Sequence, residues 1–203
     1  MNTPLDPSPT RILIVCTGNI CRSPYAEVLL TSGLAEVEAC GFEVRSAGTG
    51  ALRGHPIDPS SAALLGPLAA TAAGFAATQL TAGLITRQDV VLTMTREHRG
   101  AVLRLCPEAL RRTFSLREFA RLLDTVESGR LPRSRAGRWK HLGPELAANR
   151  TGARLPDPAQ DDVVDPFGQE PEVFRRMASQ IVPAVERIIA FERTAVQEDS
   201  GPR

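Results

Sequence analysis

The sequence of 203 residues has no long apolar run, almost no net charge and no basic stretch. No segment approaches the ~18 apolar residues of a membrane span, and residues 1–10 lack the charged and apolar regions of a signal peptide. A formal charge of +1 gives no reason to expect nucleic acid or an anionic membrane as a partner. We therefore expect a soluble, cytoplasmic protein whose ligand is recognised by a local site.

Histidine and cysteine are scarce. The three histidines, His55, His98 and His141, form no metal-ligand spacing, so we expect surface or loop residues and neither a metal nor a cofactor. Four cysteines without a signal peptide indicate reduced thiols and not a disulfide framework. Cys16 in particular is therefore available for chemistry.

Short apolar runs alternate with segments of helical spacing. The expected strands are residues 11–15, 42–46, 89–95 and 112–116. The expected helices are residues 23–37, 60–65, 80–88, 96–105, 117–127 and a closing helix after Pro171. This order predicts a doubly wound parallel sheet of about four strands with helices on both faces, and ligands beyond the carboxyl ends of the strands.

We expect a single domain over residues 11–193, with flexible tails at 1–10 and 194–203. Residues 129–160 are rich in Gly, Pro and Arg and contain one aromatic residue, Trp139, which predicts an irregular insertion or mobile loop. A basic cluster in this insertion is expected to be solvated; it comprises Arg130, Arg133, Arg135, Arg138 and Lys140.

The segment VCTGNICRSP, residues 15–24, joins the first expected strand to the first expected helix. All residues from Thr17 to Arg22 are non-proline, so each offers a backbone N–H, and Gly18 and Asn19 tolerate the positive φ angles that turn successive N–H groups inward. The helix adds its own N-terminal amides. The segment therefore predicts an anion-binding loop that suits phosphate.

Cys16 and Arg22 lie at the two ends of this loop. Amide dipoles and a guanidinium stabilise a thiolate, so Cys16 is expected to be a nucleophile, while the planar fork of Arg22 can hold two phosphate oxygens. The alternative is a buried strand-end cysteine and a surface arginine. Departure of an aryl oxide also calls for a carboxylic acid. Asp165 is a candidate on a turn bounded by proline and glycine, but spacing does not separate it from the other Asp-Pro pairs, at Asp6, Asp58 and Asp157.

The loop and the segment Val164-Asp-Pro-Phe-Gly168 together resemble the low-molecular-weight protein tyrosine phosphatase family, over roughly residues 11–125 and 161–192. Further matches are residues 46–49, 79–81 and 92–95. The resemblance implies a three-layer α/β fold of the flavodoxin-like, phosphotyrosine phosphatase I type. It also implies a cysteine-dependent hydrolase that needs no cofactor.

The family's roles transfer to matching positions. Cys16 would form a phosphocysteine, Arg22 would clamp the phosphate, and Asp165 would act first as general acid and then as base. Ser23 would donate a hydrogen bond to the Cys16 thiolate, and Asn19 would hold the loop through Ser46. The remaining loop residues would bind phosphate: Thr17, Gly18, Ile20 and Cys21. For Cys21 two readings stay open, a redox partner that forms a reversible disulfide with Cys16 and a small inert filler.

The chain departs from the family at three places. Phe75 occupies a position where relatives usually carry a histidine bonded into the Asn19 network. The paired aromatics that often follow the acid are reduced to Phe167. The insertion at 129–160 has no counterpart in compact members.

Several functions compete. In the protein-arginine phosphatase branch the position of Ile20 resembles threonine, so apolar Ile20 favours phosphotyrosine, although Asp165-Pro-Phe-Gly168 and Leu92-Thr-Met-Thr95 resemble the arginine branch. An arsenate reductase needs further redox cysteines downstream, where only Cys106 follows Cys40. A non-catalytic phospho-binding module would lack the nucleophile or the acid. We therefore predict a phosphoprotein phosphatase whose substrate is a phosphotyrosine protein, with a phosphoarginine protein as the alternative.

Overall fold

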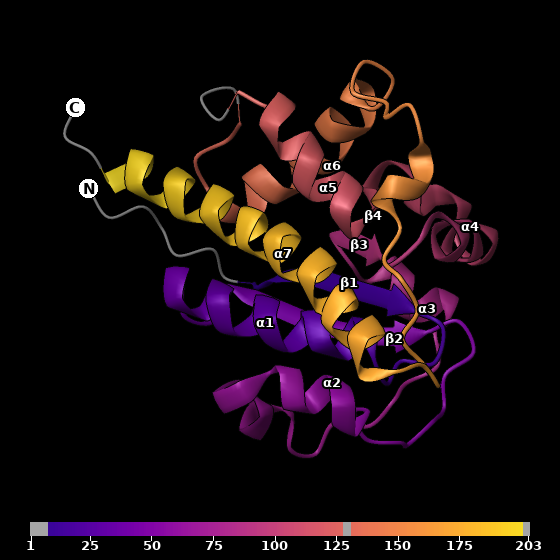
Figure 1. Cartoon of the computed structure of the whole chain (residues 1–203). Helices are drawn as coiled ribbons and strands as arrows, with labels where there is room; N and C mark the ends of the chain where they lie inside the picture. The colour runs from indigo at the N-terminus through magenta and orange to yellow at the C-terminus, as the bar shows by residue number, and fades with distance from the viewer. Residues whose placement is uncertain (1–7, 128–130, 201–203) are drawn as a thin grey trace.

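A four-stranded parallel sheet forms the centre of the protein, whose computed structural model describes residues 8–127 and 131–200 (Figure 1). Its strand order is β2-β1-β3-β4, and every neighbouring pair is parallel. The strands are β1 (Thr10–Cys16), β2 (Phe42–Gly48), β3 (Val90–Thr93) and β4 (Thr113–Ser115). The four strands expected from the sequence are confirmed, with ends shifted by a few residues.

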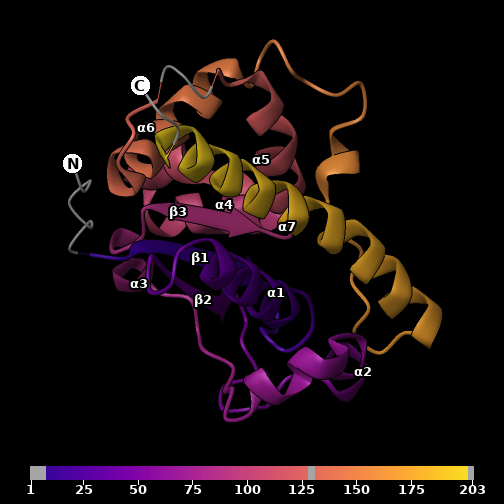
Figure 2. The same cartoon turned by 90° about the vertical axis from the view of Figure 1, so that its left-hand side faces the viewer.

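Helices cover both faces of the sheet (Figure 2). The α-helices are α1 (Arg22–Val37), α2 (Pro59–Leu64), α3 (Ala82–Thr86), α4 (Arg96–Leu105), α5 (Leu116–Leu122), α6 (Arg135–Asn149) and α7 (Pro171–Ser200). The 3-10 helices are η1 (Gly66–Ala72), η2 (Pro107–Arg112), η3 (Leu123–Thr125) and η5 (Pro158–Asp161). In the part of the chain that the structure describes, no helix combines the length and apolarity that crossing a membrane requires.

The alternation of side chains along β1 divides the core into two layers. Ile12 and Ile14 belong to a large cluster with residues of α1, α5 and α7, whereas Leu13 and Val15 belong to a smaller one with residues of α3, α4 and η2. In the views of Figures 1 and 2, α7 lies between α1 and α5, and it contacts both. This is the three-layer, doubly wound architecture that the sequence predicted.

The closing helix extends further than expected. Residues 194–200 continue α7 and are not a separate tail, because apolar residues keep their helical spacing and Ala195 is still buried. The remaining expected tails, residues 1–7 and 201–203, lie outside the described residues, while Thr10 already begins β1.

Much of the described part of the insertion is helical and not irregular. Residues 135–149 form α6, whose buried face carries Trp139, Leu142 and Leu146 at helical spacing. Trp139 is 1% exposed, stacks with Phe119 at 6.1 Å and meets Phe42 edge-on at 5.3 Å, so it packs in the core and does not cover the loop at Cys16. The Gly and Pro content had pointed to a loop, but burial of this apolar stripe stabilises a helix there.

The prediction of a solvated basic cluster is wrong for two of its members. Arg135 and Arg138 are buried and pair with Glu38 and Glu192, respectively. Glu192 also accepts the indole N–H of Trp139 at 2.9 Å. A buried guanidinium needs such a carboxylate partner, and these partners lie more than 50 residues away in sequence. Arg130 lies outside the described residues.

Candidate active site

The loop between β1 and α1 turns its carbonyl groups outward. The carbonyl oxygens of Cys16, Thr17, Gly18 and Ile20 accept backbone N–H groups from residues 49–58 at 2.8–3.0 Å. In a trans peptide the carbonyl and the following N–H point in opposite directions, so the next amides in the loop point inward. Within the described residues, the amides of Gly18, Ile20 and Cys21 donate to no protein acceptor.

The left-handed backbone of Asn19, with a φ of 55°, allows this turn. Gly48 is equally needed, because a Cβ atom there would collide with the carbonyl oxygen of Thr17. At its end the loop meets the N-terminus of α1, which no side chain caps. The loop and the helix therefore present unsatisfied donors at one place, as the sequence predicted.

The thiol of Cys16 lies among hydrogen-bond donors. The amide N–H of Asn19 donates to Sγ at 3.3 Å, and the Ser23 hydroxyl lies 3.0 Å from Sγ. The proton of Ser23 can be assigned. The Asn19 side-chain amide donates from Nδ2 to Ser23 Oγ at 2.9 Å, which leaves the hydroxyl proton of Ser23 free to donate to the sulfur.

A backbone contact fixes the orientation of the Asn19 side chain. The N–H of Thr78 donates to Asn19 Oδ1 at 2.7 Å, so Nδ2 must be the donor to Ser23 and to Ser46, at 2.7 Å. The Ser46 hydroxyl in turn donates to Glu27 at 2.5 Å. Burial raises the pKa of the Glu27 carboxyl.

The network around Asn19 closes without a histidine. Phe75 is half-buried and packs against the core, while the backbone of Thr78 supplies a donor to Asn19. The contact between Asn19 and Ser46 that the family resemblance implied is present. Neither Thr78 nor Glu27 was identified from the sequence, because a backbone donor and a helical glutamate carry no motif.

Arg22 lies inside the site. It is 4% exposed, which excludes the surface arginine considered as the alternative. Its Nη2 donates to Asp165 Oδ2 at 2.6 Å, and weaker contacts reach Thr17 Oγ1 and the carbonyl oxygen of Val163. Its Nε is buried and has no protein partner among the described residues. A buried unpartnered donor beside inward amides favours an anion at this position.

The structure separates the four Asp-Pro pairs. Asp58 caps α2 and Asp157 caps η5, each by accepting backbone amides, and Asp6 lies outside the described residues. Asp165 instead contacts the guanidinium of Arg22, and its turn ends at Gly168 with a φ of 70°. The backbone of Asp58 also contacts the loop, but of the three described it is the carboxylate of Asp165 that contacts Arg22.

A pocket of about 160 Å³ opens above the loop. Its walls combine the loop with residues from two other segments: Cys16, Thr17, Gly18, Ile20, Cys21, Arg22, Gly50, Leu52, Asp165 and Phe167. Leu52 and Phe167 are large apolar side chains that are nevertheless 39% and 58% exposed. A site of this size, well below the ~300 Å³ of drug-sized pockets, fits the end of one side chain.

His98 was expected at the surface but lies behind the loop. It is 6% exposed, its Nε2 lies 2.9 Å from Thr17 Oγ1, and its Nδ1 lies 2.8 Å from Thr95 Oγ1. Burial, with a contribution from the nearby charge of Arg22, lowers the pKa of His98 to about 4. The ring is therefore neutral at pH 7. Its place just after β3, at the carboxyl edge of the sheet, was the available signal.

All four cysteines are unpaired. Cys16, Cys21 and Cys106 are buried, whereas Cys40 is exposed. Burial, followed by the charge of Asp58, raises the pKa of Cys21 to about 12, so this thiol stays protonated at neutral pH. Within residues 8–127 and 131–200, no group of three His, Cys, Asp or Glu side chains is arranged to hold a metal ion.

The fold and the loop together define a class of α/β proteins. In this class a loop at the carboxyl edge of a parallel sheet is lined by backbone amides and contains a cysteine and an arginine separated by five residues. The model of one family, described as low molecular weight phosphotyrosine protein phosphatase, matches residues 11–128, more than half of the chain. The chain belongs to this family, which confirms the resemblance noted in the sequence.

Curated relatives match the chain over part of its length. "Probable low molecular weight protein-tyrosine-phosphatase EpsP" of Ralstonia nicotianae is 45% identical over 83 residues, which are 41% of this chain and 54% of that protein. The low molecular weight protein-tyrosine-phosphatase Etp of Escherichia coli K12 is 39% identical over 102 residues, 50% of this chain and 66% of Etp. The match to EpsP thus spans about half the length of that relative.

Solved structures match more of the chain. The YwlE arginine phosphatase of Geobacillus stearothermophilus is 27% identical with a TM-score of 0.65, and the match covers 96% of this chain and 100% of that one. The tyrosine phosphatase Wzb of Escherichia coli K30, solved in complex with phosphate, is 26% identical with a TM-score of 0.60, covering 88% and 89%. Both similarities agree with the three-layer fold.

Proposed function

We propose that this protein is a phosphoprotein phosphatase that acts through a phosphocysteine on Cys16. The observation that carries the proposal is the arrangement around Cys16 Sγ, which receives the amide of Asn19 and lies 3.0 Å from the hydroxyl of Ser23. These donors stabilise a thiolate, the reactive form of the nucleophile. Family membership supports the same chemistry.

In the first step the Cys16 thiolate attacks phosphorus and the bond from phosphorus to the leaving oxygen breaks. Asp165, protonated, gives its proton to that oxygen. In the second step Asp165, now a carboxylate, takes a proton from water as the water oxygen attacks phosphorus. The phosphorus–sulfur bond then breaks, and phosphate and the thiolate are released.

Arg22 would hold the phosphoryl oxygens throughout. Its unpartnered Nε and its Nη groups form a planar donor set, and the inward amides of the loop supply the remaining donors. As the phosphoryl group transfers, charge spreads over its equatorial oxygens, where these donors lie. A dianionic phosphate would replace Asp165 on the guanidinium and free its carboxyl for the leaving oxygen.

Phosphotyrosine is the preferred substrate in this proposal. Leu52 and Phe167 stand at the pocket mouth, where an aromatic ring could pack between exposed apolar side chains, and Ile20 offers no hydroxyl to the pocket. The second candidate is phosphoarginine, favoured by the similarity to the arginine phosphatase of Geobacillus stearothermophilus.

The nucleophile is tested with p-nitrophenyl phosphate in the absence of added metal. The parent should hydrolyse it, and Cys16→Ser should abolish turnover while its unfolding transition stays unchanged, because the hydroxyl is a far weaker nucleophile at neutral pH. Cys40→Ser, at an exposed cysteine, is the matched control and should keep parental activity. Activity of Cys16→Ser comparable to the parent would refute the assignment.

The substrate class is tested with two peptides of the same sequence, one carrying phosphotyrosine and one phosphoarginine. We expect a higher kcat/KM for the phosphotyrosine peptide. Ile20→Thr should shift the ratio of the two kcat/KM values towards phosphoarginine. A parent that prefers phosphoarginine would establish the second candidate.

Three expectations remain part of the proposal. Cys21 as a redox partner of Cys16 would react slowly, because its raised pKa leaves little thiolate at neutral pH. A cytoplasmic location remains a prediction from the sequence. The same holds for the expectation that neither nucleic acid nor membrane is a partner.

A further inference from the structure

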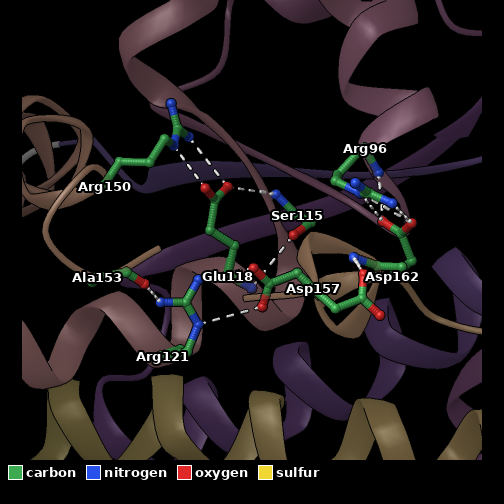
Figure 3. A network of polar contacts seen from close by, with 10 residues as sticks. Arg96, Ser115, Glu118, Arg121, Arg150, Ala153, Asp157 and Asp162 are labelled. Atoms are coloured by element: carbon green, nitrogen blue, oxygen red, sulfur yellow. Dashed lines mark hydrogen bonds and ion pairs between the residues drawn. The ribbon is translucent and has the colours of Figure 1, made fainter. Parts of the chain in front are cut away.

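The carboxylate of Asp162, three residues before Asp165, is held by the first residue of α4. Asp162 Oδ1 accepts the backbone N–H of Arg96 at 2.8 Å, and Oδ2 accepts the side-chain Nε and Nη2 of Arg96 at 3.2 and 3.1 Å (Figure 3). The amide of Arg96 belongs to the first turn of a helix, which has no intrahelical acceptor, and the positive end of the helix dipole favours a carboxylate there.

The backbone that follows Asp162 is attached as well. Val163 N–H donates to the carbonyl oxygen of Met94 at 2.8 Å, just before α4, and Val164 N–H donates to Gln180 Oε1 on α7 at 2.9 Å. Asp165 itself is held less firmly. Among the described residues its carboxylate accepts, apart from Arg22, only the N–H of Phe167, at 3.3 Å, and its side chain is 51% exposed. The position of Asp165 therefore depends on the contacts that hold residues 162–164.

The first turn of α4 also reaches the phosphate-binding loop. His98, two residues after Arg96, contacts Thr17 Oγ1 at 2.9 Å, and Thr17 follows Cys16 directly. One helical turn thus contacts both the loop with the nucleophile and the segment with the acid. A rigid element that holds two catalytic groups sets their separation.

Resting on the function proposed above, we propose that Arg96 and Asp162 are positioning residues that place Asp165 relative to Cys16. Neither lines the pocket, so both act through Asp165 and not on the substrate. The adjacent pair between Asp161 and Arg121, at 2.8 Å, ties the same segment to α5. Asp161 precedes Asp162 in the chain and is therefore further in sequence from Asp165. The contact between Arg96 and Asp162 is thus the carboxylate contact that most closely precedes Asp165.

Leaving-group dependence separates positioning from a purely structural role. We compare kcat/KM for p-nitrophenyl phosphate, a good leaving group, and phenyl phosphate, a poor one that depends on proton donation. Asp162→Ala should lower the value for phenyl phosphate about 10-fold, a fraction of the 10²–10⁴ that general acid–base catalysis supplies, and the value for p-nitrophenyl phosphate less than about threefold. Arg96→Gln, which keeps the backbone N–H contact, should show the same selectivity to a smaller extent.

The matched control is the ion pair of Arg187 and Asp124, which joins α7 to η3 and is also partly exposed. Arg187→Ala should leave both kcat/KM values at the parental level. In an Asp165→Ala background, Asp162→Ala should add no further leaving-group selectivity, because the group it positions is gone. Equal losses on the two substrates, or additive selectivity in the double variant, would overturn the proposal.

Different experimental results would refute the proposed phosphatase function and the proposed positioning role. A parent without phosphatase activity, or an Asp165→Ala variant without leaving-group selectivity, refutes the roles assigned under the proposed function. An active parent with a selective Asp165→Ala variant and unselective Asp162→Ala and Arg96→Gln variants refutes the positioning role alone. If Asp162→Ala does not fold, Arg96→Gln decides the outcome by itself, because it removes only an exposed guanidinium.

Discussion

Lowering the pH from 7 to 5 should destabilise the protein through His98 by about 2 kcal/mol. The folded pKa of His98 is about 4 against an ordinary 6.5, first because the ring is buried and second because Arg22 lies nearby; Asp165 and Asp162 oppose the shift. Between these two values the unfolded chain binds a proton that the folded protein does not. The contribution of His98 to the free energy of unfolding is therefore fully present above pH 6.5 and falls as the pH drops towards 4. The full difference corresponds to roughly 3 kcal/mol, most of which is expressed by pH 5.

The assay is urea unfolding at pH 7, 6 and 5 for the parent and for His98→Gln, whose amide does not titrate. Other groups titrate in both proteins, so the parent and His98→Gln are compared by how much the free energy of unfolding of each changes with pH. The parent should lose about 2 kcal/mol more than His98→Gln over this range. His55→Gln, at an exposed histidine, is the control and should follow the parent. Parallel pH profiles of the parent and His98→Gln would refute a buried neutral ring.

Two further predictions concern the loop and the core. Gly48→Ala should lower kcat/KM more than about tenfold, because the new Cβ displaces the carbonyl oxygen of Thr17, whereas Gly83→Ala, where a Cβ meets open space, should not; equal activity of the two variants would contradict the close approach. Glu192→Ala should cost about 3–5 kcal/mol of unfolding free energy in urea, because it removes the buried carboxylate that Arg138 and Trp139 contact, while kcat/KM of the remaining folded protein stays parental. A loss below 1 kcal/mol would show that the pair contributes little.

The alternation of strands and helices was predictable because it follows from local periodicity. Residues 12–15, for example, are continuously apolar and form most of β1, an inner strand of the sheet that is buried on both faces. The insertion was not predictable in the same way. Its helix α6 contains Pro144 and two glycines, and it is held by contacts of Trp139 with Phe42, Phe119 and Glu192, all distant in sequence.

The sequence patterns alone did not show which aspartate is the candidate general acid. Asp58, Asp157 and Asp165 share the same local chemistry before a proline, yet two of them cap helices and one lies beside Arg22. The contact between Arg22 and Asp165 joins residues 143 positions apart. Local patterns carry no information about such a separation, so only the family resemblance had favoured Asp165.

By itself the sequence determined the shape of the loop between β1 and α1, because Cys16 to Arg22 form one short segment whose shape follows from local backbone preferences and a helix start. Only the tertiary structure decided which groups surround that loop. His98 and Arg96 come from the first turn of α4, and Asp162 and Asp165 come from a second distant segment. They converge because parallel strands place their carboxyl ends at one edge of the sheet, and no local preference specifies which side chains meet there.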